Sequence, residues 1–381
     1  MAVNAPPLAA PARPRHRAVF HELRVSAVEP LTDDSVAITF EVPEELREEY
    51  DFTCGQHLSL RCLAAGDDAR RSYSICTPQG SGRLTVGVKL LDGGVFSTHA
   101  TTVMRPGDVV EVMTPAGRFG VPLDPAAERS YAAVAAGSGI TPVLSIIATT
   151  LAVEARSRFT LLFGNRTSRS IMFLEELEDL KNTHPDRFTL CHVLSREDQE
   201  VELFNGRLDA DRLRAFLAGL IPVETVDEWF LCGPAAMVRE ARAVLTEAGA
   251  DARHVHSELF HAETSASPSP DRAPGNPAVH PEGRSDAPTS TAVTIILDGR
   301  TSTFTMPRRG PSVLDAALSV REDAPFACKG GVCSTCRARC VAGEVRMDRN
   351  WALEESELEA GYVLACQSHP LTDALTLDFD G

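Results

Sequence analysis

The sequence lacks three features that each mark a broad class of protein. It has no surplus of positive charge, since its formal net charge at pH 7 is −16, and binding to a phosphate backbone needs clustered Lys and Arg. No apolar run approaches the roughly 18 residues of a membrane span. The Pro-rich segment Met1–Arg17 also lacks the apolar core of a signal peptide. We therefore expect a soluble cytoplasmic protein with neither nucleic acid nor membrane as a partner.

The chain has 381 residues, of which 43% are hydrophobic, enough for two or three domains with separate cores. Residues 1–15 are rich in Pro and Ala without periodicity, which predicts a disordered tail. Residues 16–125 contain short alternating runs, such as Ser35–Phe40, His57–Cys62 and Arg83–Leu90, separated by Gly, Pro and Asp. This pattern predicts an antiparallel β-barrel.

Residues 126–262 show a different pattern, in which buried strands alternate with helical stretches. The expected strands are Tyr131–Ala136, Phe159–Phe163, Phe188–Leu194 and Trp229–Cys232. Such alternation predicts βαβ units and a parallel sheet that binds ligands at the carboxyl ends of its strands.

The last third of the chain begins with a segment of linker composition. Residues 263–290 are dominated by Ser, Pro, Ala, Asp and Gly, which predicts a flexible linker. Residues 291–381 open with two strand-like runs, Ala292–Leu297 and Thr301–Met306, around Asp298-Gly299. Because Asp-Gly is a strong hairpin signal, we expect a third domain that starts with a hairpin and can swing on the linker.

Four cysteines in this third domain have the spacing of an iron–sulfur site. Cys328, Cys333 and Cys336 are followed 30 positions later by Cys366, which gives the C-x4-C-x2-C…C pattern of a plant-type [2Fe-2S] cluster. A zinc site would more usually show two C-x2-C pairs, and one is present. Cys340 does not fit the ligand spacing, so we expect a packed or peripheral thiol there.

Such a cluster carries one electron at a time and cannot accept hydride, so the chain needs a flavin upstream to divide electron pairs. Arg71-Ser72-Tyr73-Ser74, at the start of a strand-like stretch, offers a cation for a diphosphate, an aromatic face and a hydroxyl for a ring nitrogen. Taken alone it would equally fit a polar strand edge. Val88 and Lys89 precede Gly93-Gly94, which leads into Val95, Phe96 and Ser97 at an expected helix start. This second segment predicts a diphosphate cradle, and its alternative is a hairpin turn.

The nucleotide domain lacks the G-x-G-x-x-G fingerprint but has glycine-rich turns after its strands. The first turn runs through Gly137, Ser138, Gly139, Thr141 and Pro142, with the proline expected at the first helical position. Other strands end in Asn165-Arg166 and Ser195-Arg196, at the edge where an adenosine ribose or its phosphate would lie, although either arginine could be a surface charge. A further turn contains the residues Cys232, Gly233, Pro234 and Met237.

In this order, the motifs resemble the ferredoxin–NADP reductase-like family that carries a C-terminal plant-type ferredoxin domain. The resemblance covers residues 16–381 apart from the linker, and it implies a β-grasp α+β fold for the third domain. Within the family, the chain is similar to the reductase subunits of phenylacetyl-CoA epoxidases. The stretches that carry this are Phe163–Thr167, Cys232–Met237, Ala327–Cys333 and Glu359–Gln367.

The resemblance also implies roles for individual residues. Arg71, Tyr73 and Ser74 would hold FAD, with Ser74 near its reactive nitrogen, and Gly94–Ser97 would cradle the diphosphate. Thr141 and Cys232 would line the nicotinamide pocket. Glu258 and Phe260 would close over the flavin, although Glu258 could be a surface carboxylate. We expect Ser74, Cys232 and Glu258 to be the catalytic residues.

The expected function is transfer of hydride from NADPH or NADH to FAD, followed by single-electron transfer through the [2Fe-2S] cluster to an oxygenase. By the resemblance, that oxygenase would epoxidise the ring of phenylacetyl-CoA. A reductase for another ring-hydroxylating or steroid-hydroxylating system, and a scaffold subunit that has lost catalysis, remain alternatives. The preferred nucleotide and the oligomeric state stay open.

Overall fold

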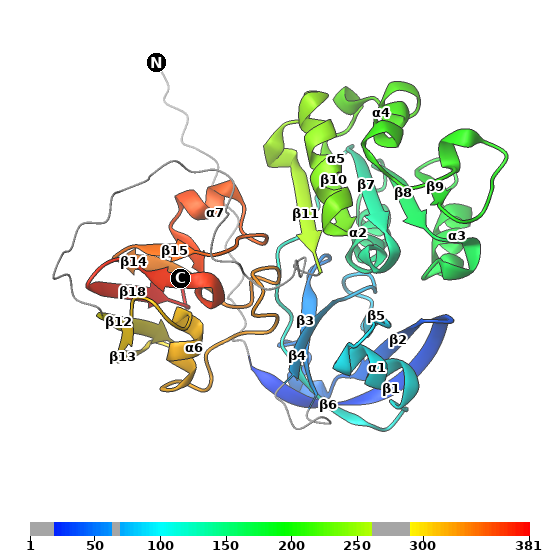
Figure 1. Cartoon of the computed structure of the whole chain (residues 1–381). Helices are drawn as coiled ribbons and strands as arrows, with labels where there is room; N and C mark the ends of the chain where they lie inside the picture. Colours follow the sequence, from blue (N-terminus) through cyan, green and yellow to red (C-terminus); the bar gives the residue numbers. More distant parts are fainter. Residues whose placement is uncertain (1–18, 63–68, 261–289) are drawn as a thin grey trace, which may run out of the picture.

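The computed structural model describes residues 19–62, 69–260 and 290–381. The expected N-terminal tail and almost all of the expected linker lie outside these residues. Within them, no helix is long and apolar enough to cross a membrane. Three groups of strands follow one another along the chain and form three separate domains (Figure 1).

The first domain is an antiparallel barrel, as predicted. Its six strands are ordered β4-β3-β6-β1-β2-β5, and a bridge between Ile75 and Val86 joins the end of β4 to β5. Alternate residues such as Leu58, Leu60 and Val86 are buried inside, because successive side chains of a strand point to opposite faces. The elements are β1 (Phe20–Thr32), β2 (Ser35–Glu41), β3 (His57–Cys62), β4 (Ala69–Ser74), β5 (Leu84–Lys89), α1 (Val95–Thr102) and β6 (Val109–Met113).

The second domain is the predicted α/β domain. Its sheet has the order β11-β10-β7-β8-β9, and all its pairs are parallel. The strands are β7 (Ser130–Ala136), β8 (Arg158–Asn165), β9 (Phe188–Leu194), β10 (Glu228–Gly233) and β11 (Val255–Leu259). The helices are α2 (Ile140–Val153), α3 (Leu174–Thr183), α4 (Ala210–Gly219) and α5 (Ala235–Glu247). Sequence periodicity did not indicate β11, whose residues are mostly polar.

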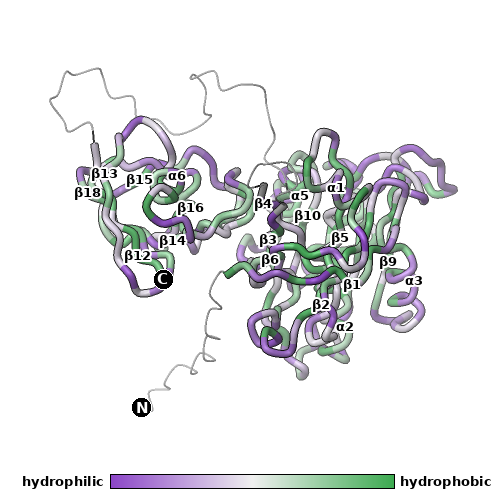
Figure 2. The backbone as a smooth tube through the Cα atoms, turned by 90° about the horizontal axis from the view of Figure 1, so that it is seen from below, coloured by the Kyte–Doolittle hydropathy of each residue, from purple (hydrophilic) through white to green (hydrophobic). Residues whose placement is uncertain are grey.

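The barrel packs against the nucleotide domain at one edge. The Ser145 hydroxyl donates to the Thr77 carbonyl over 2.7 Å, and the Gln79 amide donates to the Thr149 hydroxyl over 3.0 Å. A Cβ on Gly87 would lie 2.7 Å from a methyl carbon of Thr141. Hydrophobic segments run along the central strands of both domains, while outer segments such as α3 are hydrophilic (Figure 2).

The third domain has the α+β fold that the resemblance implied. Its main sheet has the order β13-β12-β18-β14-β16, and β15 pairs with β17. Asp298 and Gly299 form the predicted two-residue hairpin turn, with φ of 55° and 66°. The elements are β12 (Ser290–Leu297), β13 (Arg300–Pro307), α6 (Val313–Leu318), β14 (Arg337–Ala342), β15 (Val345–Met347), α7 (Glu355–Glu359), β16 (Tyr362–Leu364), β17 (Ser368–Pro370) and β18 (Ala374–Asp378).

Candidate functional site

The predicted flavin segment Arg71–Ser74 forms the end of β4, where we had expected the start of a strand. Arg71 is exposed. Tyr73 lies on the same face of the strand as Arg71, and its ring centroid is 5.2 Å from that of Phe96. Ser72 and Ser74 point to the opposite face, where the Ser72 and Ser59 hydroxyls are 3.4 Å apart. The strand therefore offers a cation and an aromatic ring on one face and a buried hydroxyl on the other.

Gly93-Gly94 leads into a helix, so the hairpin alternative was wrong. Gly94 is the N-cap of α1, and no side chain in the described part of the chain caps this helix end. Its first amide groups are therefore available to an anion. A Cβ on Gly94 would lie 2.4 Å from the Ser97 hydroxyl. The neighbouring side chains of Leu91 and Val95 are 48% and 43% exposed, an apolar rim suited to a large planar ligand.

Two other predicted flavin residues contribute less. Val88 is fully buried in the barrel core, so its side chain cannot face a cofactor. The Lys89 ammonium is 2.9 Å from an Asp34 carboxylate oxygen, and this ion pair fixes it beside β2.

Ser74 and Glu258 meet across the boundary between the barrel and the nucleotide domain. The Ser74 hydroxyl donates to a Glu258 carboxylate oxygen over 3.0 Å. Burial raises the pKa of Glu258 to about 7, against the opposing effect of this hydrogen bond. The carboxyl group therefore changes protonation near neutral pH, and it is half-buried rather than a surface carboxylate.

Cys232 lies beside Glu258, opposite it in the β10–β11 register. Its side chain is fully buried, and burial, with a contribution from the Glu258 charge, raises the pKa of the thiol well above its ordinary value. Cys232 is thus a neutral thiol, which can pack against a ligand or donate a weak hydrogen bond but is not a thiolate nucleophile.

The turn after β7 fits closely against the end of β10. A Cβ on Gly139 would lie 2.2 Å from the carbonyl oxygen of Cys232, so any side chain there would force the turn to move. The Thr141 hydroxyl donates to the Ser138 carbonyl over 3.0 Å. The helix begins at Ile140, two residues before Pro142. Our placement of the proline at the first helical position was therefore wrong, and the preceding turn Gly137–Gly139 is a short 3-10 helix.

The other predicted nucleotide residues gather at the carboxyl ends of β8, β9 and β10. The Ser195 amide donates to the Asn165 carbonyl, and the Arg196 amide donates to the Arg166 carbonyl, over 3.0 and 2.8 Å. Both arginine side chains are exposed, and the buried Asn165 side-chain nitrogen has no hydrogen-bond partner among the described residues. At the β10 turn, Pro234 caps α5, and a Cβ on Gly233 would lie 2.7 Å from the Met237 methyl group. Phe260, just after β11, packs against the domain core.

The four predicted cluster ligands lie together as free thiols in two pairs. The thiols of Cys328 and Cys333 contact each other, as do those of Cys336 and Cys366. The hydrogen bond from Cys333 lowers the pKa of the Cys328 thiol despite burial, and the Gly330 amide donates to the same sulfur over 3.3 Å. No three His, Cys, Asp or Glu side chains among the described residues could hold a single metal ion. Two thiol pairs instead fit two irons with two thiolates each.

The structure also reveals two features of the loop Cys328–Cys336, the cluster loop, that the cysteine spacing did not indicate. The Gln367 side-chain amide donates to the Cys366 sulfur over 3.5 Å and to the Lys329 carbonyl over 2.9 Å. Lys329 and Ser334 both have positive φ, 49° and 50°, which bends the backbone around the sulfurs. The Cys340 thiol instead donates to the carbonyl groups of Ala342 and Gly343.

A cleft of about 1560 Å³ lies where the three domains meet. Its wall includes Glu258 and His256 of β11, Arg70 and Arg118 of the barrel, and the segment 332–335 of the cluster loop. The cluster loop and Glu258 therefore border one space.

Three family models match successive parts of the chain. An oxidoreductase FAD-binding domain matches residues 22–120, an oxidoreductase NAD-binding domain matches 133–243, and a 2Fe-2S iron–sulfur cluster binding domain matches 295–371. These ranges fall on the barrel, the parallel-sheet domain and the third domain.

Two curated relatives align over nearly the whole chain. A component of the 1,2-phenylacetyl-CoA epoxidase from Escherichia coli is 44% identical over 95% of this chain and 98% of its own. The chain belongs to the family of flavin and iron–sulfur reductases that serve oxygenases. The ferredoxin reductase component of 3-ketosteroid-9-alpha-monooxygenase from Rhodococcus rhodochrous is 33% identical to the reductase, over 94% of this chain and 96% of its own.

Among solved structures, phthalate dioxygenase reductase has the same fold as the reductase. It aligns with a TM-score of 0.56 and 22% identity, over 94% of this chain and 98% of its own. The reductase is thus an oxidoreductase with FAD, a nicotinamide nucleotide and a [2Fe-2S] cluster as its redox groups, and an oxygenase component as its partner.

Proposed function

We propose that this reductase delivers electrons to an oxygenase that epoxidises the ring of phenylacetyl-CoA, in the cytoplasm. The observation that supports this is the 44% identity to the E. coli epoxidase component over 95% of the chain, against 33% for the steroid monooxygenase component. A steroid-hydroxylating partner is the second candidate, because those relatives also align from end to end.

FAD, when bound, accepts hydride and releases its electrons singly to an iron–sulfur centre. In this proposal Arg71 binds the diphosphate together with the free amides at the start of α1, and Tyr73 stacks on the ring system. Ser74 holds the reactive edge of the ring through its hydroxyl. Glu258 orients that hydroxyl, since the two groups are 3.0 Å apart.

The nucleotide would bind along the carboxyl ends of the parallel strands, the usual place in this architecture. Thr141 and the neutral Cys232 thiol would line the nicotinamide pocket at the turns after β7 and β10. Arg166 and Arg196, both exposed and joined through their backbones, would bind a phosphate on the adenosine ribose. This favours NADPH over NADH. Cys328, Cys333, Cys336 and Cys366 would hold the cluster.

The test combines the purified reductase with the oxygenase component of a phenylacetyl-CoA epoxidase and, separately, with that of a 3-ketosteroid monooxygenase. We expect NADPH oxidation to be coupled to formation of the ring epoxide of phenylacetyl-CoA and not to steroid hydroxylation. Coupled turnover with the steroid system alone would select the second candidate. Full NADPH-dependent reduction of an artificial acceptor without either product would show that the reductase serves another oxygenase.

A further inference from the structure

Arg70 joins the flavin barrel to the cluster domain. Its guanidinium carbon lies 3.8 Å from the ring centroid of Phe326 and 5.0 Å from that of Phe20, so the cation is stacked between an aromatic ring of each domain. Arg70 and Phe326 are only 8% and 7% exposed. A buried guanidinium between two rings is among the stronger forms of cation–π contact.

The position of this contact connects it to both redox sites. Phe326 precedes the ligand Cys328 by two residues. Arg70 and Ser74 lie on the same face of β4, because residues four apart in a strand point the same way. The Ser74 hydroxyl donates to Glu258. One face of one short strand therefore contacts the cluster loop at one end and the flavin-site carboxylate at the other.

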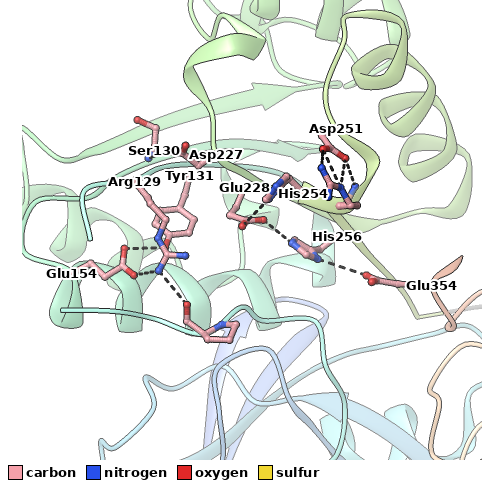
Figure 3. A network of polar contacts seen from close by, with 12 residues as sticks. Arg129, Ser130, Tyr131, Glu154, Asp227, Glu228, Asp251, His254, His256 and Glu354 are labelled. Carbon is pink, nitrogen blue, oxygen red and sulfur yellow. Dashed lines mark hydrogen bonds and ion pairs between the residues drawn. The ribbon is translucent and has the colours of Figure 1, made fainter. Parts of the chain in front are cut away.

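Further contacts hold the cluster domain in the same place. Val332, between two ligands, is 7% exposed and belongs to the apolar core of the nucleotide domain. Glu354 of the cluster domain forms an ion pair with His256 on β11 (Figure 3), with a separation of 3.6 Å. Arg118 of the barrel is 3.4 Å from Glu357. The docked position is thus supported from both the barrel and the nucleotide domain.

We infer that Arg70 and Phe326 are positioning residues for electron transfer, whose stacking fixes the cluster loop against β4 and so sets the separation between the flavin site and the cluster. The ion pairs around His256 and Arg118 are more exposed and more easily screened by salt. The stacked pair, by contrast, is shielded from water and specific in geometry. Arg70 lies on β4 and Phe326 just before Cys328, outside the nucleotide turns after β7 and β10, so we expect hydride transfer to be independent of them.

The test compares Phe326→Leu with Phe304→Leu in the FAD- and cluster-loaded full chain. Phe304 is a half-buried ring that packs against the core of the same domain, so it controls for the loss of an aromatic side chain. The first readout is the maximum dimension from solution X-ray scattering. The second compares two acceptors, ferricyanide, which can take electrons directly at a flavin, and cytochrome c, reduced through the cluster.

We expect Phe326→Leu to widen the molecule and to lower cytochrome c reduction by roughly tenfold or more, since loss of a desolvated cation–π contact changes a docking equilibrium by that factor. Ferricyanide reduction should stay within about twofold of the parent, within the range of the Phe304→Leu control. Unchanged scattering and acceptor rates in Phe326→Leu would overturn the inference. So would equal loss with both acceptors at full FAD and iron content, because the defect would then precede the cluster.

Arg70→Lys provides an independent variant if Phe326→Leu loads cofactors poorly. Lysine keeps the charge but lacks the planar group that stacks on both rings. The inference expects an intermediate loss with cytochrome c and none with ferricyanide. Full activity of Arg70→Lys with both acceptors would contradict it.

Discussion

Glu258 is the residue whose protonation the structure ties to the boundary between two domains. Its pKa in the folded protein is about 7, raised by burial, whereas an unfolded glutamate titrates near 4.3. The folded state thus binds this proton more tightly, and the contribution of Glu258 to stability is lost as the pH rises from about 4.3 to about 7.

Glu258→Gln should remove that loss. When the pH is raised from 5 to 8, the unfolding free energy of the variant should therefore increase relative to that of the parent, by at most about 3 kcal/mol. The measurement is urea unfolding followed by circular dichroism at both pH values, with the exposed Glu224→Gln as control. A difference between variant and parent that does not change with pH would show that Glu258 titrates like an ordinary surface carboxylate.

Arg196 bears on the choice of nucleotide. If its exposed guanidinium binds the ribose phosphate, Arg196→Leu removes a charged hydrogen bond, and KM for NADPH should rise by roughly tenfold or more while KM for NADH hardly changes. Arg207→Leu, an exposed arginine beyond β9, should leave both constants unaltered. Equal effects of Arg196→Leu on NADPH and NADH would place the phosphate elsewhere.

At the scale of elements, the turn between β7 and α2 is constrained by backbone packing. A methyl group on Gly139 would lie 2.2 Å from the Cys232 carbonyl oxygen and 2.8 Å from the Gly233 amide nitrogen, so the turn must move away from β10. Neither atom can rotate aside as a side chain would. This turn is also where the nucleotide is expected to bind.

Gly139→Ala should therefore destabilise the protein by about 1–3 kcal/mol and weaken nucleotide binding. Thermal unfolding and titration with NADPH would measure the two effects. Gly219→Ala, at the end of α4, should leave both unchanged, because no atom of the described residues lies within 4 Å of the added carbon. Wild-type nucleotide affinity in Gly139→Ala would show that this turn does not contact the nucleotide.

Elements were predicted well where their own residues carry the periodicity and poorly where they do not. The buried strand β7 and the Asp298-Gly299 hairpin follow from local patterns. By contrast β11, with the sequence Val-His-Ser-Glu-Leu, has no strong apolar pattern. It is the last strand at one side of its sheet, and its three polar side chains contact other elements. The strand is defined by pairing with β10, which the sequence does not show.

At the scale of the whole molecule, His256 links the nucleotide domain to the cluster domain. Burial alone would lower the pKa of its imidazole, but hydrogen bonds with Glu228 on β10 and Glu354 before α7 outweigh this and raise the pKa to about 9. His254, Arg242 and Arg118 are the other charged groups that act on these carboxylates. Between the lowered carboxylate pKa values and about pH 9, the His256–Glu354 pair is charged.

Raising the pH through 9 should therefore weaken this attachment, because His256 loses its proton. We expect the radius of gyration to increase from pH 7.5 to pH 10 in the parent. His256→Gln should show the more extended form already at pH 7.5. The His254 ring pairs with Glu228 of its own domain, so His254→Gln should behave like the parent. An equal dependence on pH in His256→Gln would assign the effect to other groups.

The sequence by itself determined the three domains and predicted the four cysteines of the cluster site. Strand periodicity, the change to βαβ alternation and the spacing of Cys328, Cys333 and Cys336 are properties of neighbouring residues, and local geometry follows from them. The individual flavin and nucleotide motifs could be recognised in the same way. Which of their side chains act together could not be derived from those patterns.

Only the tertiary structure decided how the domains meet. Ser74 and Glu258 are 184 positions apart, and Arg70 contacts a ring at Phe326 in another domain. Such pairs form because the folded surfaces of separate domains have complementary shape and charge, and neither partner's local sequence encodes the other. The protonation of Glu258 near neutral pH and the docked position of the cluster loop both arise from that packing.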